Sequence, residues 1–402
     1  MESPLPGVID TAQNIQRRAL TFVVLMGVVS LLADMVYEGG RSIAGPYLAL
    51  LGASGTAVGL VAGFGELIGY GLRLLFGYLS DRTRRYWAFT IAGYALTALA
   101  VPALALAGNW QLAVVFLTVE RISKALRSPA KDTLLAYATS SIGHGKGFGL
   151  HEVLDQIGAV AAPLLLAAVI AWQGNYRLAY AVLIIPGILR IVVLLMARAR
   201  LPQPESLAGH TLALATRGFT GRFWLYLAAV GLIAAGFADF PLIAYHLQRT
   251  AVLPSATIPA LYALAMAVDA LAAFLFGLLF DRVGFQALTL AALLSAGFAP
   301  LAFSGSAALV LLGMVLWGIG MGAQESILRA AVAGMVAPER RGTAYGLFNT
   351  GYGLFWFAGS AVLGSLYDVS LPTLIAVSVG LQLMAVVVLV IVSRSSEPSP
   401  QA

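Results

Sequence analysis

The feature that most constrains this chain is a series of long apolar runs separated by short polar connections. A helical run of about 18 or more apolar residues is long enough to cross the hydrocarbon core of a bilayer. The alternation at every second residue that a lipid-facing barrel strand requires is missing, whereas helices satisfy their own backbone polar groups in lipid. We therefore predict an all-α integral membrane protein. Its twelve predicted transmembrane helices cover approximately residues 20–41, 56–79, 87–107, 111–134, 147–171, 176–197, 221–247, 256–280, 286–304, 307–334, 343–367 and 371–393.

The composition supports a membrane protein and excludes several other classes. The chain is 60% hydrophobic and 10% charged, whereas soluble domains average about 25% charged residues. Cysteine is absent, which excludes a disulfide framework, a thiol nucleophile and a Cys-ligated metal site. The net charge of +6 is too small and too dispersed to indicate nucleic-acid binding. Residues 1–10 are polar and show no cleavage site, so the first span is expected to act as the insertion signal, with membrane lipid as the surrounding partner.

The chain divides into two halves of six predicted spans each. Residues 199–220 form the longest polar connection, and Pro202 and Pro204 give it the composition of a linker. We predict an N-terminal six-helix bundle over 1–198, a cytoplasmic linker over 199–220 and a C-terminal six-helix bundle over 221–402.

A repeated motif indicates that the two halves are copies of one bundle. The matching stretches are Gly77-Tyr-Leu-Ser-Asp81-Arg82 and Gly277-Leu-Leu-Phe-Asp281-Arg282, 200 positions apart. A second match, between the starts of the fifth and eleventh spans at Gly149 and Gly346, has an offset of 197. A duplicated bundle predicts a site between its halves.

The distribution of basic residues predicts the orientation, because cytoplasmic connections carry an excess of lysine and arginine. One set of span ends carries most of them, and the opposite connections carry little beyond Arg177 and Arg249. We therefore expect a multi-pass protein of the cell inner (plasma) membrane with both termini cytoplasmic. The basic set is Arg17, Arg18, Arg82, Arg84, Arg85, Lys146, Arg198, Arg200, Arg217, Arg222, Arg282, Arg340, Arg341 and Arg394.

These residues carry a resemblance to a known family: the chain resembles the major facilitator superfamily of secondary transporters over essentially its whole length. The family's loop signature is matched by Gly77, Asp81, Arg82 and Arg85, with Arg84 where a second glycine is usual. The second copy keeps Gly277, Asp281, Arg282 and Gly284. The resemblance implies that this element is a conformational latch, which joins the halves in the outward-open state through charge pairing and through an aspartate that faces a helix start.

Two further family patterns are present in degenerate form. In the fourth span, Arg121 keeps the arginine of a motif that is associated with proton movement, while Lys124 and Ala125 replace its glutamine and glycine. In the fifth span, Gly158 and Pro163 keep part of a motif that marks many drug:proton antiporters. This similarity implies export coupled to proton entry.

Ionisable side chains at membrane depth are the candidate functional groups, because they are costly there. In the first span Asp34, Glu38 and Arg41 share one helix face, with Tyr37 beside it. Burial disfavours a charged carboxylate, so Asp34 and Glu38 are predicted to exchange protons near neutral pH, with Arg121 as the electrostatic neighbour of Asp34. The alternative is that Arg41 neutralises Glu38 in a structural pair.

The second and fourth spans add further charges. Glu66 and Arg73 lie seven residues apart on one face and are expected either to form an ion pair or to contact substrate. The fourth span carries a charged stripe that no lipid-facing helix tolerates, so it must line a cavity or a helix interface. The stripe consists of Glu120, Lys124, Arg127 and Lys131, with Arg121 adjacent.

The fifth span supplies His151, Glu152 and Asp155, of which His151 and Asp155 share a face. An imidazole beside a carboxylate can relay protons near neutrality. The same groups suit a divalent metal, or ion pairing with Arg127 or Lys131. We assign His151 and Asp155 to proton coupling and assign no metal site or cofactor.

The C-terminal half carries solitary acids in its seventh, eighth and tenth spans. Beside the first of them, Pro241 frees backbone carbonyls and predicts a bend in the seventh span. The predicted substrate-binding residues of both halves are Tyr37, Arg41, Glu66, Lys124, Asp239, Asp269 and Glu325.

The sequence contains no Walker loop, zincin motif or nucleophile elbow, so we predict neither an enzyme nor a nucleotide-driven pump. The predicted function is a monomeric, proton-coupled secondary transporter that exports a small organic solute by alternating access. The alternatives are uptake of an anionic solute at Arg41, Arg121 and Lys124, export of a divalent cation, and a transporter-like receptor or scaffold.

Overall fold

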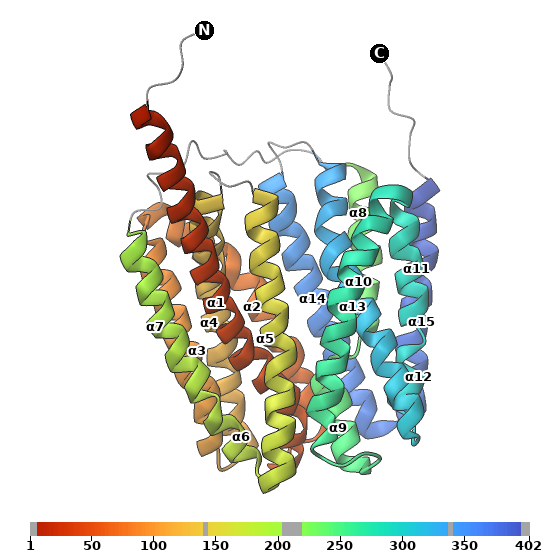
Figure 1. Ribbon diagram of the computed structural model, residues 1–402. Helices are drawn as coiled ribbons and strands as arrows, with labels where there is room; N and C mark the ends of the chain where they lie inside the picture. Colours follow the sequence, from red (N-terminus) through yellow and green to blue (C-terminus); the bar gives the residue numbers. More distant parts are fainter. Residues whose placement is uncertain (1–5, 140–143, 203–218, 337–340, 395–402) are drawn as a thin grey trace.

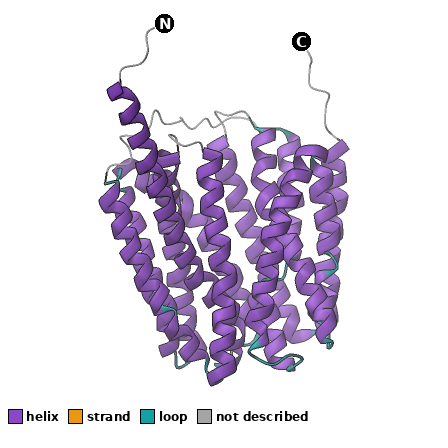
Figure 2. Ribbon diagram, in the orientation of Figure 1, coloured by secondary structure: helices purple, strands orange, loops and turns teal. Residues whose placement is uncertain are grey.

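The computed structural model describes residues 6–139, 144–202, 219–336 and 341–394, and these residues form a bundle of helices without strands (Figures 1 and 2). The predicted all-α architecture is confirmed. Ten helical stretches within these ranges are long and apolar enough to cross a membrane. The other two long helices, α4 and α14, run beside them in the bundle; α4 carries the charged stripe and α14 is rich in glycine.

The first half of the chain forms six passes, one of which is divided into two helices. Its elements are α1 (Pro6–Leu50), α2 (Gly55–Thr83), α3 (Tyr86–Ala103) with the 3-10 turn η1 (Leu104–Leu106), α4 (Trp110–Thr139), α5 (His144–Gln173), α6 (Tyr176–Val182) and α7 (Ile184–Arg200). The second half repeats this plan. Its elements are α8 (Gly221–Gly236), α9 (Phe240–Thr250), α10 (Thr257–Val283), α11 (Phe285–Ser295), α12 (Phe298–Ala302), α13 (Ala307–Met335), α14 (Arg341–Val369) and α15 (Leu371–Arg394).

The start of α1 and the end of α15 lie at the same end of the bundle (Figure 1). We call this the basic end, because the ends of α2, α7 and α10 also bring their arginines there, among them Arg82, Arg200 and Arg282. The other end is called the opposite end. The linker predicted over 199–220 lies mostly outside the described residues.

α1 is longer than the sequence indicates. The prediction ended the first span at Arg41, whereas the helix continues for nine more residues to Leu50. The charge at Arg41 interrupts the apolar run, so the sequence predicts the end of the span there. Because the helix continues through Ile43 and Leu48, which are buried, Arg41 lies within the membrane-depth part of α1 rather than at its boundary.

The seventh pass is broken near its middle, as Pro241 predicted. α8 ends at Gly236 and α9 begins at Phe240, whose backbone N–H donates to the Asp239 side chain at 2.9 Å. Trp317 donates its indole N–H to the Ala238 carbonyl at 3.0 Å and satisfies one of the freed backbone groups. α8 packs against α14 and α15 of its own half, whereas α9 packs against α1 of the other half.

Glycines allow the helices of the two halves to approach closely at two places. Between α2 and α14, a Cβ atom on Gly364 would lie 2.8 Å from the Cα atom of Gly59. Between α1 and α9, a Cβ atom on Gly45 would lie 2.8 Å from the backbone nitrogen of Tyr245. Both contacts join the N-terminal half to the C-terminal half, so these glycines set how tightly the halves close.

Candidate functional site

A network of ion pairs joins the two halves near the middle of the bundle. Arg41 on α1 contacts Asp239 at the start of α9, with 2.5 Å between Nη2 and Oδ1. The same guanidinium lies 3.7 Å from the carboxylate of Glu66 on α2. The Asp239 side chain is 1% exposed, so the pair is shielded from solvent and its charges depend on each other.

Glu66 lies between two arginines. Arg121 on α4 contacts its Oε1 atom at 3.0 Å and also lies 3.5 Å from Glu120 on the same helix. The Arg121 guanidinium additionally donates a hydrogen bond to the hydroxyl of Tyr37. The prediction of a Glu66–Arg73 pair is therefore not the arrangement found: Glu66 contacts Arg121 and Arg41, and Arg73 lies over the Tyr70 ring at 5.0 Å.

Tyr37 is surrounded by three basic side chains. Arg41 donates to its hydroxyl at 3.4 Å, and the Lys124 ammonium lies 3.5 Å from the ring centroid. Arg121 lies over the same ring at 5.1 Å. Cations are attracted to the negative face of an aromatic ring, so Tyr37 holds the positive groups of α1 and α4 together.

A second contact between the halves involves Glu38. The hydroxyl of Tyr262 on α10 donates to Glu38 Oε2 at 2.5 Å. The alternative prediction, an ion pair of Arg41 with Glu38, is not the arrangement found. Arg41 pairs with Asp239, and Glu38 accepts a hydrogen bond from Tyr262. The sequence did not indicate Tyr262 as a partner, because its register against α1 depends on how the halves meet.

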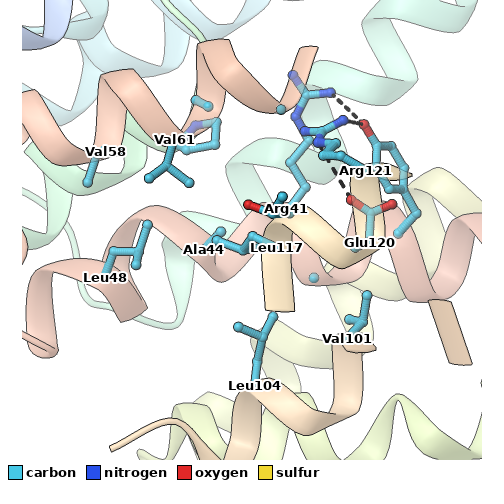
Figure 3. Close-up of a pocket in the computed structure, with 16 residues that line it drawn as sticks. Arg41, Ala44, Leu48, Val58, Val61, Val101, Leu104, Leu117, Glu120 and Arg121 are labelled. Atoms are coloured by element: carbon cyan, nitrogen blue, oxygen red, sulfur yellow. Dashed lines mark hydrogen bonds and ion pairs between the residues drawn. The ribbon is translucent and has the colours of Figure 1, made fainter. Parts of the chain in front are cut away.

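A small cavity adjoins this network on the N-terminal side (Figure 3). Arg121 and Glu120 lie at its polar end, while Leu48, Val58 and Leu104 contribute to its apolar walls. Its volume is about 40 Å³. A buried water needs roughly 10–15 Å³ measured in this way, so the cavity holds a few waters and is too small for an organic solute.

Asp34 lies in a different set of charges from the one predicted. It interacts electrostatically with Asp155 on α5 and with Lys124 and Lys131 on α4. Arg121, predicted as its neighbour, has its ion pairs with Glu66 and Glu120 instead. Lys124 therefore takes the place that the sequence analysis gave to Arg121.

The acids of α5, α10 and α13 form a separate group. His151, Glu152 and Asp155 each offer a ligand atom, and these atoms lie within 4.8 Å of one another. Asp269 on α10 is 1% exposed, and Glu325 on α13, Glu38 on α1 and Glu152 on α5 all act on it electrostatically. Asp269 and Glu325, predicted as substrate-binding residues, thus lie apart from the ion pairs of Arg41 and Arg121.

The two copies of the loop motif lie at the basic end, each at the end of a helix. Asp81 accepts a hydrogen bond from the Tyr86 hydroxyl at 3.2 Å, and Arg82 donates to the Tyr78 hydroxyl at 3.4 Å. Both partners belong to the same half, so these bonds do not join the halves. In the second copy, Asp281 and Arg282 are exposed at the end of α10.

The backbone at these loops explains the glycine in the motif. Arg84 follows α2 with φ of 53° and ψ of 23°, and Gly284 follows α10 with φ of 60°. Left-handed backbone of this kind favours glycine, since a Cβ atom is strained there. Gly77, by contrast, faces Pro129, and Gly277 faces Ser326. Arg85 begins α3.

The sequence analysis missed a contact between the halves at the opposite end. The Asp368 carboxylate on α14 accepts from the backbone N–H groups of Gly55 at 2.9 Å and Thr56 at 2.7 Å, and from the Thr56 hydroxyl at 2.7 Å. A carboxylate at the start of a helix interacts favourably with the helix dipole. A lone acid near the end of an apolar span was the available signal, but it did not identify the partner helix.

Other hydrogen bonds join the halves at the same end. The Tyr245 hydroxyl on α9 donates to the Ala53 carbonyl at 2.9 Å, and the Tyr176 hydroxyl on α6 donates to Gln248 at 2.9 Å. Together with Asp368, these contacts close the space between the halves at the opposite end.

Comparison with known proteins gives one family. The family model described as Major Facilitator Superfamily matches residues 25–360 and 225–401. An uncharacterized protein of Mycobacterium tuberculosis is 45% identical over 378 residues, which cover 92% of each chain. An uncharacterized MFS-type transporter of Methanocaldococcus jannaschii is 27% identical over 361 residues, covering 87% of this chain and 89% of the relative.

Solved structures share the fold at low sequence identity. The crystal structure of the nucleoside transporter NupG matches with a TM-score of 0.71 and 14% identity, covering 92% of this chain and 98% of that one. A bacterial homolog of the human lysosomal transporter Spinster, in an inward-facing and unoccupied conformation, matches with a TM-score of 0.75 and 15% identity, covering 96% and 99%.

Proposed function

Because the chain belongs to the Major Facilitator Superfamily and is thus a secondary transporter, we propose that it couples proton entry to the export of a small organic solute by alternating access. The state described is closed at the opposite end by Asp368, Tyr245 and Tyr176. With the basic end on the cytoplasmic side, as the charge distribution predicts, closure at the opposite end shuts the bundle on its outer side.

The observation that carries the proposal is the ion pair between Arg41 and Asp239. It joins the two halves in the middle of the bundle, at 2.5 Å and with little exposure to solvent. When the halves separate at this depth, each charge must find another partner. An energetic link between a charge and the conformation is what ion coupling requires.

Near the middle of the bundle, two carboxylates contact the other half in this state. Asp239 binds Arg41, and Glu38 binds Tyr262. A proton on either carboxylate changes a contact between the halves and so changes the relative stability of the two states. Asp34, one helical turn before Glu38 and close to Lys124, is the proposed first acceptor of the proton.

The packing of α5 on α1 supports export. A Cβ atom on Gly158 would lie 2.9 Å from the carbonyl carbon of Leu31, so this glycine allows the two helices to touch. Gly158 belongs to the motif that resembles that of drug:proton antiporters. The motif thus lies against the helix that carries Asp34 and Glu38, where it can link solute passage to those carboxylates.

The proposal is tested by flux in proteoliposomes under an imposed pH gradient. The assay is run with an organic cation, an organic anion and a divalent metal ion, since each rival function predicts a different responding solute. For the responding solute, Asp34→Asn should abolish gradient-driven accumulation and leave counterflow largely intact. Accumulation that is indifferent to pH in the native protein would refute proton coupling.

A second function is favoured by the basic groups around Tyr37. Arg41, Arg121 and Lys124 all contact this side chain, and together they offer a binding surface for an anionic solute. In that case the organic anion responds in the flux assay, and it moves in the same direction as the proton.

A further inference from the structure

One imidazole and two carboxylates of α5 form a cluster that lies outside the Arg41 network. His151, Glu152 and Asp155 occupy one turn of the helix, and their potential ligand atoms lie within 4.8 Å of one another. Ligands about 2.0–2.2 Å from a tetrahedral zinc ion lie about 3.3–3.6 Å apart. Side-chain rotations that move the ligand atoms by about 1 Å would therefore bring all three to bonding distance of a single ion.

One ring nitrogen of His151 is buried without a hydrogen-bond partner among the described residues. This nitrogen is Nε2, and the residue as a whole is 4% exposed. The Oδ1 atom of Asp155 is likewise buried without a hydrogen bond among these residues. Burying polar atoms unpaired is costly, and a bound ion would satisfy both atoms at once.

The surroundings of the cluster carry an excess of negative charge. Asp34 of α1 acts on Asp155, and Asp269 of α10 is acted on by Glu152. Two lysines face the same region, but each has an acidic partner. Lys131 forms an ion pair with Asp132 at 3.6 Å and also interacts with Asp155 and His151, and Lys124 interacts with Glu38 and Asp34. A bound cation would therefore compete with Lys131 for Asp155.

From this geometry we infer that His151, Glu152 and Asp155 bind a divalent transition-metal cation. One imidazole and two carboxylates suit zinc, cobalt or manganese better than magnesium, which prefers an all-oxygen, octahedral shell. Three protein ligands leave a coordination position open. Glu152 is exposed, so the site can be reached from the surface of the bundle.

The proposed metal site lies close to a contact between the halves, because Asp269 belongs to the C-terminal half. α5 packs against α10, and the acidic groups on the two helices face each other across this contact. A divalent cation on α5 would screen their repulsion. Binding is therefore expected to stabilise the described state, whether or not the cation is transported. The inference does not depend on proton coupling.

The experiment is cobalt binding to the full-length protein, purified in detergent with an affinity tag that contains no histidine. Visible absorption of Co²⁺ reports histidine and carboxylate coordination, and calorimetry gives the stoichiometry and affinity. We expect saturable binding of one ion per chain, with Zn²⁺ competing and Mg²⁺ not competing. His151→Ala and Asp155→Asn should each weaken binding at least tenfold.

His246→Ala is the matched control. His246 is also a buried histidine, 3% exposed, but it lies on α9 and contacts the Tyr367 hydroxyl at 3.1 Å. This variant should bind cobalt as the native protein does. Size-exclusion profiles and melting without metal show that each variant is folded. Because Asp155→Asn is nearly isosteric, it still tests the site if His151→Ala does not fold.

Three results would overturn the inference: no saturable cobalt signal in the native protein, equal binding by native protein and a folded Asp155→Asn variant, or loss of binding in His246→Ala. The test is independent of the flux assay. Failure of proton coupling with cobalt binding intact would refute only the proposed function, and the reverse result would refute only the metal site.

Discussion

At the scale of single residues, Glu66 is the central anion of the ion-pair network. It contacts Arg121 at 3.0 Å and Arg41 at 3.7 Å, and its side chain is 13% exposed. Two buried guanidinium groups therefore share one carboxylate. Removing one partner of a buried ion pair leaves an uncompensated charge, which is more costly than the pair itself is stabilising.

Glu66→Gln is accordingly expected to destabilise the protein by about 3 kcal/mol and to lower the melting temperature in detergent by roughly 4 °C. Glu120→Gln is the matched control, because among the described residues Glu120 forms one ion pair, with Arg121 at 3.5 Å, and its loss should have the smaller effect. Melting is followed by the fluorescence of the native tryptophans. Equal melting temperatures for Glu66→Gln and the native protein would show that the network does not hold this state together.

Asp239 has two roles that substitution can separate. Its Oδ1 atom pairs with Arg41 and also accepts from the Phe240 backbone N–H at the start of α9. Asn keeps a capping oxygen but removes the charge, whereas Ala removes both.

We therefore expect Asp239→Asn to reduce gradient-driven flux about tenfold and to lower the melting temperature, because Arg41 loses a buried partner. Asp239→Ala should show the same loss of flux and should be less stable than Asp239→Asn by about 1 kcal/mol. Flux and melting are measured on the same preparations. Native-like flux in Asp239→Asn would remove the Arg41–Asp239 pair from the coupling mechanism.

The residues of the site were easier to predict than their partners. Asp34, Glu38, Arg41 and Arg121 stood out because charges are costly at membrane depth. The partners of these groups depend on the rotation of each helix and on the register between the halves, and neither is encoded in local spacing. Lys124 therefore replaced Arg121 beside Asp34.

At the scale of secondary-structure elements, the contacts at helix ends indicate which conformational state the structure describes. At the opposite end, Asp368 of α14 binds the first backbone N–H groups of α2. This is the kind of contact that the family resemblance implies for the loop aspartate Asp81 at the basic end, in the other state. Asp81 here bonds to Tyr86 within its own half.

Asp368→Asn should weaken this closure, because hydrogen bonds to a charged group contribute about 1.5–3 kcal/mol. The population is then expected to shift toward a state that is open at the opposite end. The native chain has no cysteine, so a spin-label pair at Gly108→Cys and Thr250→Cys reports the separation of the halves. Double electron–electron resonance should show longer distances between the two labels in the variant.

Thr289→Ala serves as the control for this measurement, because the Thr289 hydroxyl donates to the Phe285 carbonyl of its own helix, α11. It should leave the distance distribution unchanged. An unchanged distribution in Asp368→Asn would show that other contacts, such as that of Tyr245 with Ala53, suffice for closure.

The elements themselves were largely predictable, since long apolar runs leave helices as the available structure in lipid. A charged residue made one boundary hard to predict: Arg41 interrupts the apolar run, whereas α1 continues to Leu50. The break in the seventh span was predicted from Pro241 because proline acts on the local backbone, independently of tertiary contacts.

At the scale of the whole molecule, the duplicated motifs and the positions of the basic residues predict both the architecture and its orientation. The fold is confirmed by the helical bundle and by the family match. The orientation rests on the charge distribution, and a membrane-impermeant probe can test it.

Single cysteines at Gly108, which lies at the opposite end, and at Arg394, which lies at the basic end, should react differently with an impermeant maleimide in intact cells. Gly108→Cys should be labelled at once, and Arg394→Cys only after the cells are permeabilised, because positive connections remain cytoplasmic. The cysteine-free native chain is the blank. The reverse pattern would place both termini outside.

The interruption of the seventh pass at residues 237–239 has a consequence for how the molecule moves. α9 packs on α1, across the boundary between the halves, while α8 stays among α14 and α15. The unwound segment can therefore serve as a pivot, at which we expect α9 to change its angle to α8 when its contacts with α1 break. The seventh crossing would then bend inside the membrane as the halves separate.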